Sequence, residues 1–149
     1  MGNIRLIDIN KDNWLKLCLL TPGEAGEKFV APNAISIVQS VYDNDGQWVI
    51  KGIAHGNDII GFTMYGYNVD DKAYDLCRFM LDQKFQGRGY GQKALKVIVE
   101  EMCARFNCEK IYLSTDPENS LGKYIYEKFG FINTGQLVDG EELFVLDLP

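Results

Sequence analysis

A short glycine-rich segment that follows an apolar strand constrains this chain more than any other feature. Met80 to Gly91 reads MLDQKFQGRGYG, and an amphipathic helical pattern follows it. Glycine has no Cβ, so a ligand can approach the backbone, and the first N–H groups of the next helix have no partner within it. These donors and the positive end of the helix dipole favour a phosphate. The segment therefore predicts an anion-binding loop, although a glycine-rich turn without a ligand fits the same letters.

Length and composition predict a single globular domain spanning residues 1–149. The chain is 46% hydrophobic and 24% charged, which suffices for one core without disulfides or metals. No apolar run reaches the roughly 20 residues of a membrane span. The first residues lack the design of a signal peptide, so we expect a cytoplasmic protein. The net charge of −6 argues against a nucleic-acid partner and suits a cationic small substrate without selecting one.

The cysteine and histidine content argues against a metal site. The four cysteines form no C-x-x-C pair, and His55 is the only histidine. We therefore expect no metal and interpret the cysteines as small core residues rather than as disulfides or nucleophiles. A Cys/His hydrolase would need a thiol such as Cys77 to meet His55, and nothing in the pattern supports that pairing.

Hydrophobic periodicity predicts the order of the elements. Strands are expected at residues 3–9, 47–54, 59–66, 74–81, 110–114, 131–137 and 141–148. Helices are expected at 11–20, 33–43, from the glycine segment to 106, and from 119 or 120 to 128, with a loop at 24–32. Three consecutive antiparallel strands lead into the glycine segment. The helix after it crosses over to a parallel strand.

This order disfavours two other phosphate-binding folds. A nucleoside triphosphate site would be expected to show G-x-x-x-x-G-K-[ST], which is absent. A Rossmann fold would place its glycine turn near the start of repeated strand-helix-strand units. Here the glycine segment follows a run of antiparallel strands instead.

The element order and two motifs resemble the GCN5-related N-acetyltransferase (GNAT) superfamily over the whole chain. Its acetyl-coenzyme A signature, [QR]-x-x-G-x-[GA], is matched at Gln86, Gly89 and Gly91, and a second segment is matched by Asn119 and by YIYEKFGF at 124–131. The resemblance implies an α/β (α+β) fold with a mixed, mostly antiparallel sheet of about seven strands and about four helices. It also implies that the sheet splays at the strand before the glycine segment.

The same resemblance implies acetyl-CoA as co-substrate and assigns its contacts. The amides of the glycine segment would bind the pyrophosphate, and the end of the preceding strand would bind the pantetheine arm and the thioester carbonyl. Asn119 would orient the far end of that arm. The implied coenzyme-binding residues are Met80, Leu81, Gln86, Gly87, Arg88, Gly89, Tyr90, Gly91, Gln92 and Asn119.

Two residues are candidates for proton transfer. By the resemblance, Tyr126 would be the general acid for the departing thiolate; the alternative is a core aromatic beside Phe129 and Phe131. Asp75 would act through water as the base for the incoming amine, unless it merely starts a strand near solvent. Alternation places the side chains at 75, 77, 79 and 81 on one strand face.

The acceptor is less strongly indicated than the donor. The segments FVAPN at 29–33, with Ser36, and RFMLD at 78–82 look like bacterial spermine/spermidine acetyltransferases, which implies a polyamine. Those enzymes usually carry a glutamine near the place of Glu27. Glu24 and Glu27 are our candidates for binding this cation, with further acids at Asp43, Asp70, Asp71 and Asp75.

Other acceptors and one other class of function stay open. The same fold could acetylate an aminoglycoside, an amino acid or a protein N-terminus. A protein that senses acetyl-CoA without catalysis is the alternative from another class, and Tyr126 argues against it. The closing hairpin at 131–148 could pair with a second copy of the chain and form a homodimer.

Overall fold

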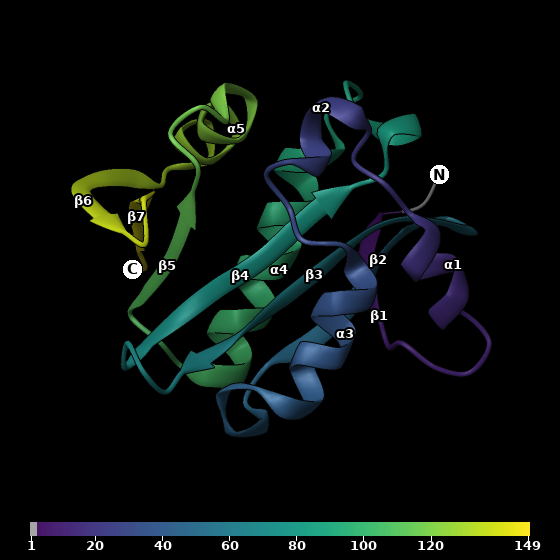
Figure 1. Cartoon of the computed structure of the whole chain (residues 1–149), viewed down its shortest axis with the longest axis horizontal. Coiled ribbons are helices and arrows are strands. Elements are labelled where there is room, and N and C mark those ends of the chain that lie inside the picture. The colour runs from purple at the N-terminus through teal and green to yellow at the C-terminus, as the bar shows by residue number, and fades with distance from the viewer. Residues whose placement is uncertain (1–2) are drawn as a thin grey trace.

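The framework of the molecule is one seven-stranded sheet with the order β1-β2-β3-β4-β5-β7-β6 (Figure 1). The computed structural model describes residues 3–149; Met1 and Gly2, part of the segment that lacks a signal-peptide pattern, lie outside the described residues. All neighbouring strands are antiparallel except β4 and β5, which are parallel. The predicted mixed, mostly antiparallel α/β fold is confirmed. The strands are β1 (Ile4–Ile7), β2 (Val49–His55), β3 (Asp58–Asn68), β4 (Ala73–Leu81), β5 (Lys110–Thr115), β6 (Ile132–Val138) and β7 (Glu141–Asp147).

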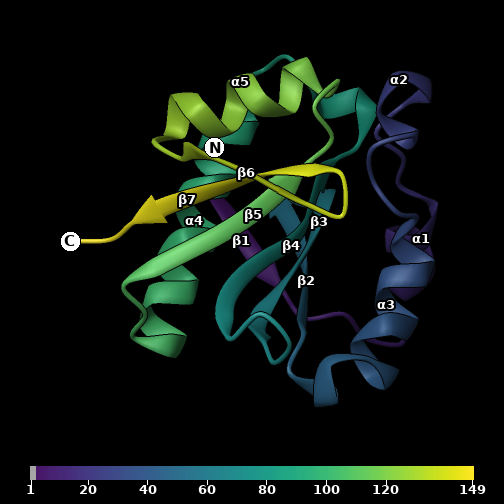
Figure 2. The same cartoon turned by 60° about the vertical axis from the view of Figure 1, so that its left-hand side comes forward.

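Helices cover both faces of this sheet. Figure 2 shows α1, α2 and α3 on one side and α4 on the other. The α-helices are α1 (Trp14–Leu19), α2 (Glu24–Glu27), α3 (Asn33–Tyr42), α4 (Tyr90–Phe106) and α5 (Ser120–Phe129), and the short 3₁₀ helices are η1 (Asn44–Gly46) and η2 (Gln83–Phe85). Among residues 3–149, no helix is long and apolar enough to cross a membrane.

Two α-helical segments differ from the prediction by more than one residue. The first helix begins at Trp14 rather than Lys11, because the side chain of Asn13 accepts a bond from the N–H of Asn10 and that of Asn10 accepts one from Asp12. These local bonds hold the chain in a turn instead of a helix. The predicted loop at 24–32 contains the one-turn helix α2.

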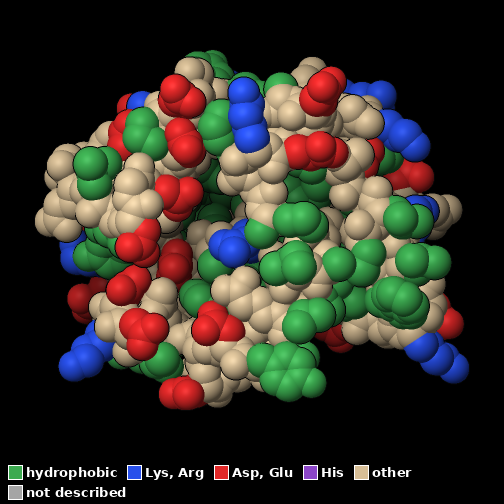
Figure 3. Space-filling model, in the orientation of Figure 1, with side chains coloured by type: hydrophobic (Ala, Val, Ile, Leu, Met, Phe, Trp, Pro, Cys, Tyr) green, Lys and Arg blue, Asp and Glu red, His purple; other side chains and the backbone are tan. Residues whose placement is uncertain are grey.

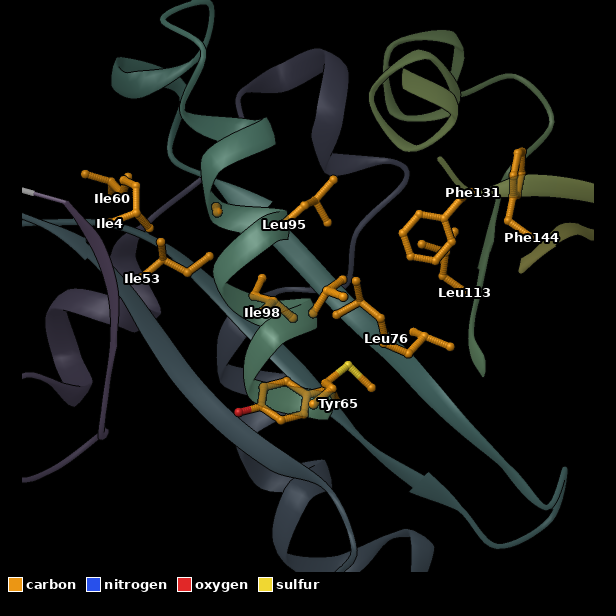
Figure 4. Close-up of a cluster of buried hydrophobic side chains, with 14 residues drawn as sticks. Ile4, Ile53, Ile60, Tyr65, Leu76, Leu95, Ile98, Leu113, Phe131 and Phe144 are labelled. Atoms are coloured by element: carbon orange, nitrogen blue, oxygen red, sulfur yellow. The ribbon is translucent and has the colours of Figure 1, made fainter. Parts of the chain in front are cut away.

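The core is divided by the sheet into two clusters. The first lies between the sheet and α4, where Leu95 and Ile98 pack among strand residues such as Ile53 and Leu76 (Figure 4). The second lies on the face covered by α1 and α3 and is centred on Phe62. Full burial of a side chain of this size contributes about 1.5–3 kcal/mol. Both helix layers are therefore fixed to the strands of the sheet.

The sheet splays between β4 and β5. Only one residue pair, Asp75 with Tyr112, bridges these strands, whereas β5 pairs with β7 along its whole length. Figure 1 shows β4 and β5 diverging from that point. Because the ladder stops there, backbone groups on the facing edges of the two strands have no strand partner. This is the predicted splay.

A β-bulge in β4 changes the face of the sheet to which the following side chains point. Consecutive residues of β3 pair with Leu76 and Arg78, so Cys77 is the extra residue. Cys77 consequently packs with the α1/α3 cluster, whereas Phe79 packs with the α4 cluster. The expectation that the side chains at 75, 77, 79 and 81 share one face is wrong, because the bulge interrupts the alternation.

Candidate active site

The glycine segment forms an open loop between β4 and α4. Gly87 and Gly89 have φ angles of +77° and +81°, and a Cβ at either position would meet no atom within 4 Å. The Gln86 side chain donates to the carbonyls of Leu81 and Pro22 at 2.9 and 3.1 Å, which ties the loop to the end of β4. Among residues 3–149, no acceptor lies opposite the N–H groups of residues 87–89. The protein leaves these donors and the space above them open to a ligand.

The first turn of α4 continues this row of donors. Its N-cap is Gly89, and no side chain caps the helix, so the amides of the first turn have no intrahelical acceptor. The side-chain amide of Gln92 donates to the carbonyl of Ile125 at 2.9 Å and joins α4 to α5. Tyr90 packs on His55, with ring centroids 4.9 Å apart, and Arg88 lies over the Phe85 ring.

Asp82 holds the start of the glycine loop in place through hydrogen bonds to the backbone. Its buried carboxylate accepts hydrogen bonds from the N–H groups of Thr21 at 2.9 Å and Lys84 at 3.2 Å. A carboxylate held by two backbone donors joins the N-terminal connection to the end of β4. Asp82 therefore fixes the geometry of the loop.

A cleft of about 290 Å³ opens where β4 and β5 diverge. Figure 3 shows the hollow on the face toward the viewer, with acidic side chains along one flank. Its walls come from β4, the end of β5, the start of α5, the segment after α2 and the start of β7. The lining residues are Phe29, Val30, Ala31, Asp75, Leu76, Cys77, Arg78, Phe79, Leu113, Ser114, Thr115, Asn119, Tyr126 and Glu141.

Tyr126 lines this cleft and also packs against aromatic rings. Its ring centroid lies 6.5 Å from that of Phe79 and 6.1 Å from that of Phe131. Burial, and to a smaller extent the negative charge of Glu141, raises the pKa of the phenol to about 12. The hydroxyl therefore keeps its proton at physiological pH. The aromatic packing predicted as the alternative is therefore present, and the position of Tyr126 in the cleft leaves the role of general acid as a proposal.

Asp75 lies at the closed end of the cleft, where β4 meets β5. The pKa of its carboxyl is raised to about 6, because the effect of burial outweighs that of a hydrogen bond from Asn68 at 3.4 Å and of the positive charge of Arg78, both of which lower it. The negative charges of Asp71 and Glu141 act in the same direction as burial. A carboxylate with a pKa near 6 is ionised at neutral pH and is a stronger base than an ordinary aspartate.

Asn119 lines the cleft as the N-cap of α5. Its Oδ1 accepts from the N–H of Gly122 at 3.1 Å, and its Nδ2 donates to Oγ1 of Thr115 at 3.0 Å. Both polar groups of the side chain are therefore engaged within the protein. Asn119 positions α5, and with it Tyr126, against the end of β5.

Glu24 and Glu27 lie on α2, both exposed, and neither lines the cleft. Glu27 accepts a bond from the hydroxyl of Thr21 at 2.8 Å. The apolar residues that follow α2 line the cleft in their place. Of the other predicted acids, only Asp75 lines it.

Four polar residues of the cleft, Arg78, Ser114, Thr115 and Glu141, were not among the predicted site residues. Glu141 begins β7 and accepts a hydrogen bond from the hydroxyl of Ser114 at 2.8 Å. Arg78 follows the β4 bulge. Ser114 and Thr115 form the end of β5, a strand that the sequence predicted, whereas the approach of Glu141 depends on the pairing of β7 with β5.

Comparison with known families agrees with this architecture. The model of the "Acetyltransferase (GNAT) family" matches residues 12–131. The chain belongs to the GNAT family. It is therefore an acetyltransferase that uses acetyl-CoA as co-substrate, as the glycine segment and Asn119 to Phe131 predicted. Within residues 3–149, no group of three His, Cys, Asp or Glu side chains is arranged to hold a metal ion.

Similar GNAT proteins include polyamine acetyltransferases. The spermine/spermidine N(1)-acetyltransferase of Bacillus subtilis (strain 168) is 36% identical over 104 residues, which cover 65% of this chain and 68% of that protein. The spermidine N(1)-acetyltransferase of Escherichia coli (strain K12) is 31% identical over 68 residues, or 46% of this chain and 36% of that protein.

Solved structures of GNAT enzymes share the fold. Spermidine N-acetyltransferase from Vibrio cholerae, in complex with CoA and spermine, aligns with a TM-score of 0.74 at 14% identity over 96% of this chain and 93% of that one. AAC(6')-Ib in complex with ribostamycin and coenzyme A aligns with a TM-score of 0.78 at 16% identity over 97% and 93%. Identities this low establish the fold and leave the acceptor open.

Proposed function

We propose that this GNAT enzyme acetylates a primary amine of a polyamine, spermidine or spermine. The observation that carries the proposal is the 36% identity to a Bacillus subtilis protein named for that activity. The cleft supports it, because the carboxylates of Asp75 and Glu141 lie in its wall and would attract a cationic acceptor. Glu24 and Glu27, outside the cleft on α2, would attract the same cation as it approaches.

The coenzyme would lie along the open edge of β4 and the glycine loop. Amides of Gln86 to Gly91 and of the first turn of α4 would hold its pyrophosphate. Backbone groups of Met80 and Leu81, beyond the last bridge to β5, would position its pantetheine arm and thioester. The coenzyme supplies an activated acetyl thioester; the protein supplies position and proton transfer.

Two side chains would handle the protons of a direct attack. Asp75, ionised at neutral pH, would take the proton of the incoming ammonium through a water molecule. Tyr126, protonated at neutral pH, would give its proton to the sulfur as the thiolate leaves. Both line the same cleft, one from each side of the splay, which supports a single site for both transfers.

Release of coenzyme A thiol from acetyl-CoA tests the proposal. Spermidine and spermine should give thiol release well above the rate without amine, and mass spectrometry should detect one added acetyl group. An aminoglycoside, free amino acids and a peptide N-terminus serve as competing acceptors. Turnover of one of these with none on either polyamine would refute the polyamine assignment.

We also propose a cytoplasmic, single-domain protein that forms a homodimer through β6 and β7. All four cysteines are free thiols, which suits a reducing compartment. β6 is an edge strand, and Ile132 and Leu137 on it are 62% and 67% exposed. Large exposed apolar side chains on an unpaired edge favour association.

A further inference from the structure

Arg78 is a cation inside the cleft without a carboxylate partner. It lines the same cleft as Asp75 and Glu141, yet none of the five ion pairs among residues 3–149 includes it. Its guanidinium donates to the backbone oxygen and Sγ of Cys77, both at 3.0 Å, and to Oε1 of Gln39 at 3.3 Å. Its Nε is buried and finds no acceptor within this part of the chain.

The guanidinium is held in this position from α3. Gln39, which accepts from Arg78, donates in turn to Oδ2 of Asp43 at 3.1 Å. The same oxygen accepts from Nε1 of Trp48 at 3.1 Å. This chain of hydrogen bonds restrains the guanidinium. Its charge therefore stays on the α3 side of the cleft.

Arg78 and the two acids occupy different parts of the cleft. Asp75 is at the closed end, at the bridge to Tyr112 of β5, whereas Glu141 begins β7 and bonds Ser114, two residues beyond that bridge. Arg78 lies three residues beyond Asp75 on β4, on the wall next to α3. A thioester held at the end of β4 would therefore react nearer to Arg78 than to the bridge. The non-reacting part of a long amine would extend toward Glu141 on the β7 side.

The two kinds of charge have opposite effects on an amine. Only the free base can attack, and about one molecule in a thousand of an amine with a pKa near 10 is free base at pH 7. Carboxylates improve binding of the cation but stabilise its ammonium form, whereas a nearby positive charge destabilises that form. A reactive polyamine site therefore benefits from both, at different nitrogens.

We propose that Arg78 is a positioning residue that keeps the reacting nitrogen of the acceptor in its free-base form, while Glu141 holds a remaining ammonium group. The inference rests on the proposed amine acetylation. The reacting ammonium gives its proton to Asp75 through water, and the freed lone pair forms the C–N bond to the acetyl carbon. The C–S bond then breaks, Tyr126 protonates the leaving thiolate, and the proton that the nitrogen loses on becoming an amide returns to the Tyr126 phenolate. Titratable or charged groups around this space are Asp75 and Cys77 on β4, Asp43 at the end of α3, Tyr126 on α5 and Glu141 on β7.

The pH dependence of kcat at saturating acetyl-CoA tests this role. kcat reports groups in the bound complex, so the limb that rises with pH includes deprotonation of the bound amine. A unit charge within about 10 Å at an effective dielectric near 20 is worth about one pKa unit. Arg78→Gln should move that limb up by about one pH unit, and Arg78→Lys should restore it. Lys96→Gln removes an exposed charge from α4 and should leave it unchanged.

Two further comparisons separate the electrostatic role from a structural one. When the acceptor is replaced by an amine with a different pKa, the part of the pH–kcat profile that reports deprotonation of the amine should shift with that pKa. The part that reports deprotonation of Asp75 should stay where it is. At pH 7, Arg78→Gln should lower KM for spermidine severalfold while kcat falls, because the repulsion that opposes binding is removed. Coincident pH profiles for wild type and Arg78→Gln, or equal shifts in Arg78→Gln and Arg78→Lys, would overturn the proposal.

An error in the role proposed for Arg78 and an error in the polyamine assignment give different results. Kinetics use whichever primary amine the wild type acetylates, so inactivity with polyamines alone would refute only the acceptor. A calorimetric titration of spermidine into the CoA-bound protein needs no turnover. Tighter binding to Arg78→Gln than to wild type at pH 7 supports the role, and equal or weaker binding contradicts it. Thermal melting of each variant checks that it folds.

Discussion

At the scale of the residue, Asp75 carries a cost in stability that a role in proton transfer explains. Burial raises the pKa of this carboxyl from its ordinary 3.8 to about 6. The folded state therefore binds the proton more tightly than the unfolded state does. The resulting stabilisation is complete below about pH 3.8 and is lost as the pH rises through about 6. At neutral pH an ionised Asp75 destabilises the fold.

Asp75→Asn should consequently gain stability and lose activity. Removing the buried charge should raise the free energy of unfolding at pH 8 by about 1–3 kcal/mol, or the melting temperature by on the order of 5 °C. The gain should disappear at pH 4. kcat should fall, and its limb near pH 6 should vanish. Calorimetry and pH–rate profiles check both parts; unchanged stability would contradict the stated burial of the charge.

Tyr126→Phe separates the aromatic packing of Tyr126 from the proposed role of its hydroxyl as an acid. Phenylalanine keeps the packing against Phe79 and Phe131 and removes only the hydroxyl. kcat should fall about 10²-fold, while the melting temperature and the KM for acetyl-CoA stay close to wild type. Tyr124→Phe, at an exposed position on the same helix, is the control. Steady-state kinetics showing wild-type turnover in Tyr126→Phe would exclude the acid assignment.

At the scale of the element, the glycine loop combines a strained backbone with unfilled space. Gly89 has a positive φ, and the room where its Cβ would lie is open. Nothing in the protein occupies that room. Two properties of glycine therefore suit position 89. It adopts the positive φ without strain, and it leaves space for a ligand to approach the backbone.

Gly89→Ala and Gly140→Ala distinguish these two properties. Both residues have a φ of +81° and open space at the Cβ, but Gly140 lies in the turn between β6 and β7. Each substitution should cost about 1–2 kcal/mol of stability from the left-handed conformation. Only Gly89→Ala should also raise the KM for acetyl-CoA, by about tenfold or more. Equal effects on KM would argue against a phosphate at the loop.

The elements that sequence patterns predicted well are those with a strong local signal. α4 follows its 3.6-residue period and buries Leu95, Ile98 and Met102, as expected. The one-turn helix α2 and the β4 bulge were missed, because each depends on contacts outside its own segment. The bulge mattered most, since it decides which way Cys77 and its neighbours point.

At the scale of the whole molecule, the half of the site proposed for the donor lies in one local segment, whereas the half proposed for the acceptor does not. The proposed donor half consists of a contiguous loop and the start of one helix. The cleft proposed for the acceptor brings Arg78, Ser114 and Glu141 together from β4, β5 and β7. Their proximity depends on strand pairings between distant segments, which no local pattern encodes. That is why the sequence favoured Glu24 and Glu27, which lie outside the cleft.

The proposed dimer is testable at this scale. Light scattering after size exclusion should give twice the 16.9 kDa of one chain. Leu137→Glu, on the β6 edge, should give the monomer mass, because a charge at an apolar interface is costly. Val41→Glu, on the opposite helical layer and 63% exposed, should leave the dimer intact. A monomer mass for the wild type, or dissociation by Val41→Glu, would contradict assembly through β6 and β7.

The single bridge between β4 and β5 links substrate occupancy to folding. The apoprotein lacks part of a hydrogen-bond ladder in the middle of its sheet. A ligand that lies along this edge binds only the folded state and stabilises it by mass action, by about 2.7 kcal/mol at a hundred times its dissociation constant. Each release of product would then return the protein to a looser sheet. The melting temperature of the protein should therefore rise with the concentration of acetyl-CoA.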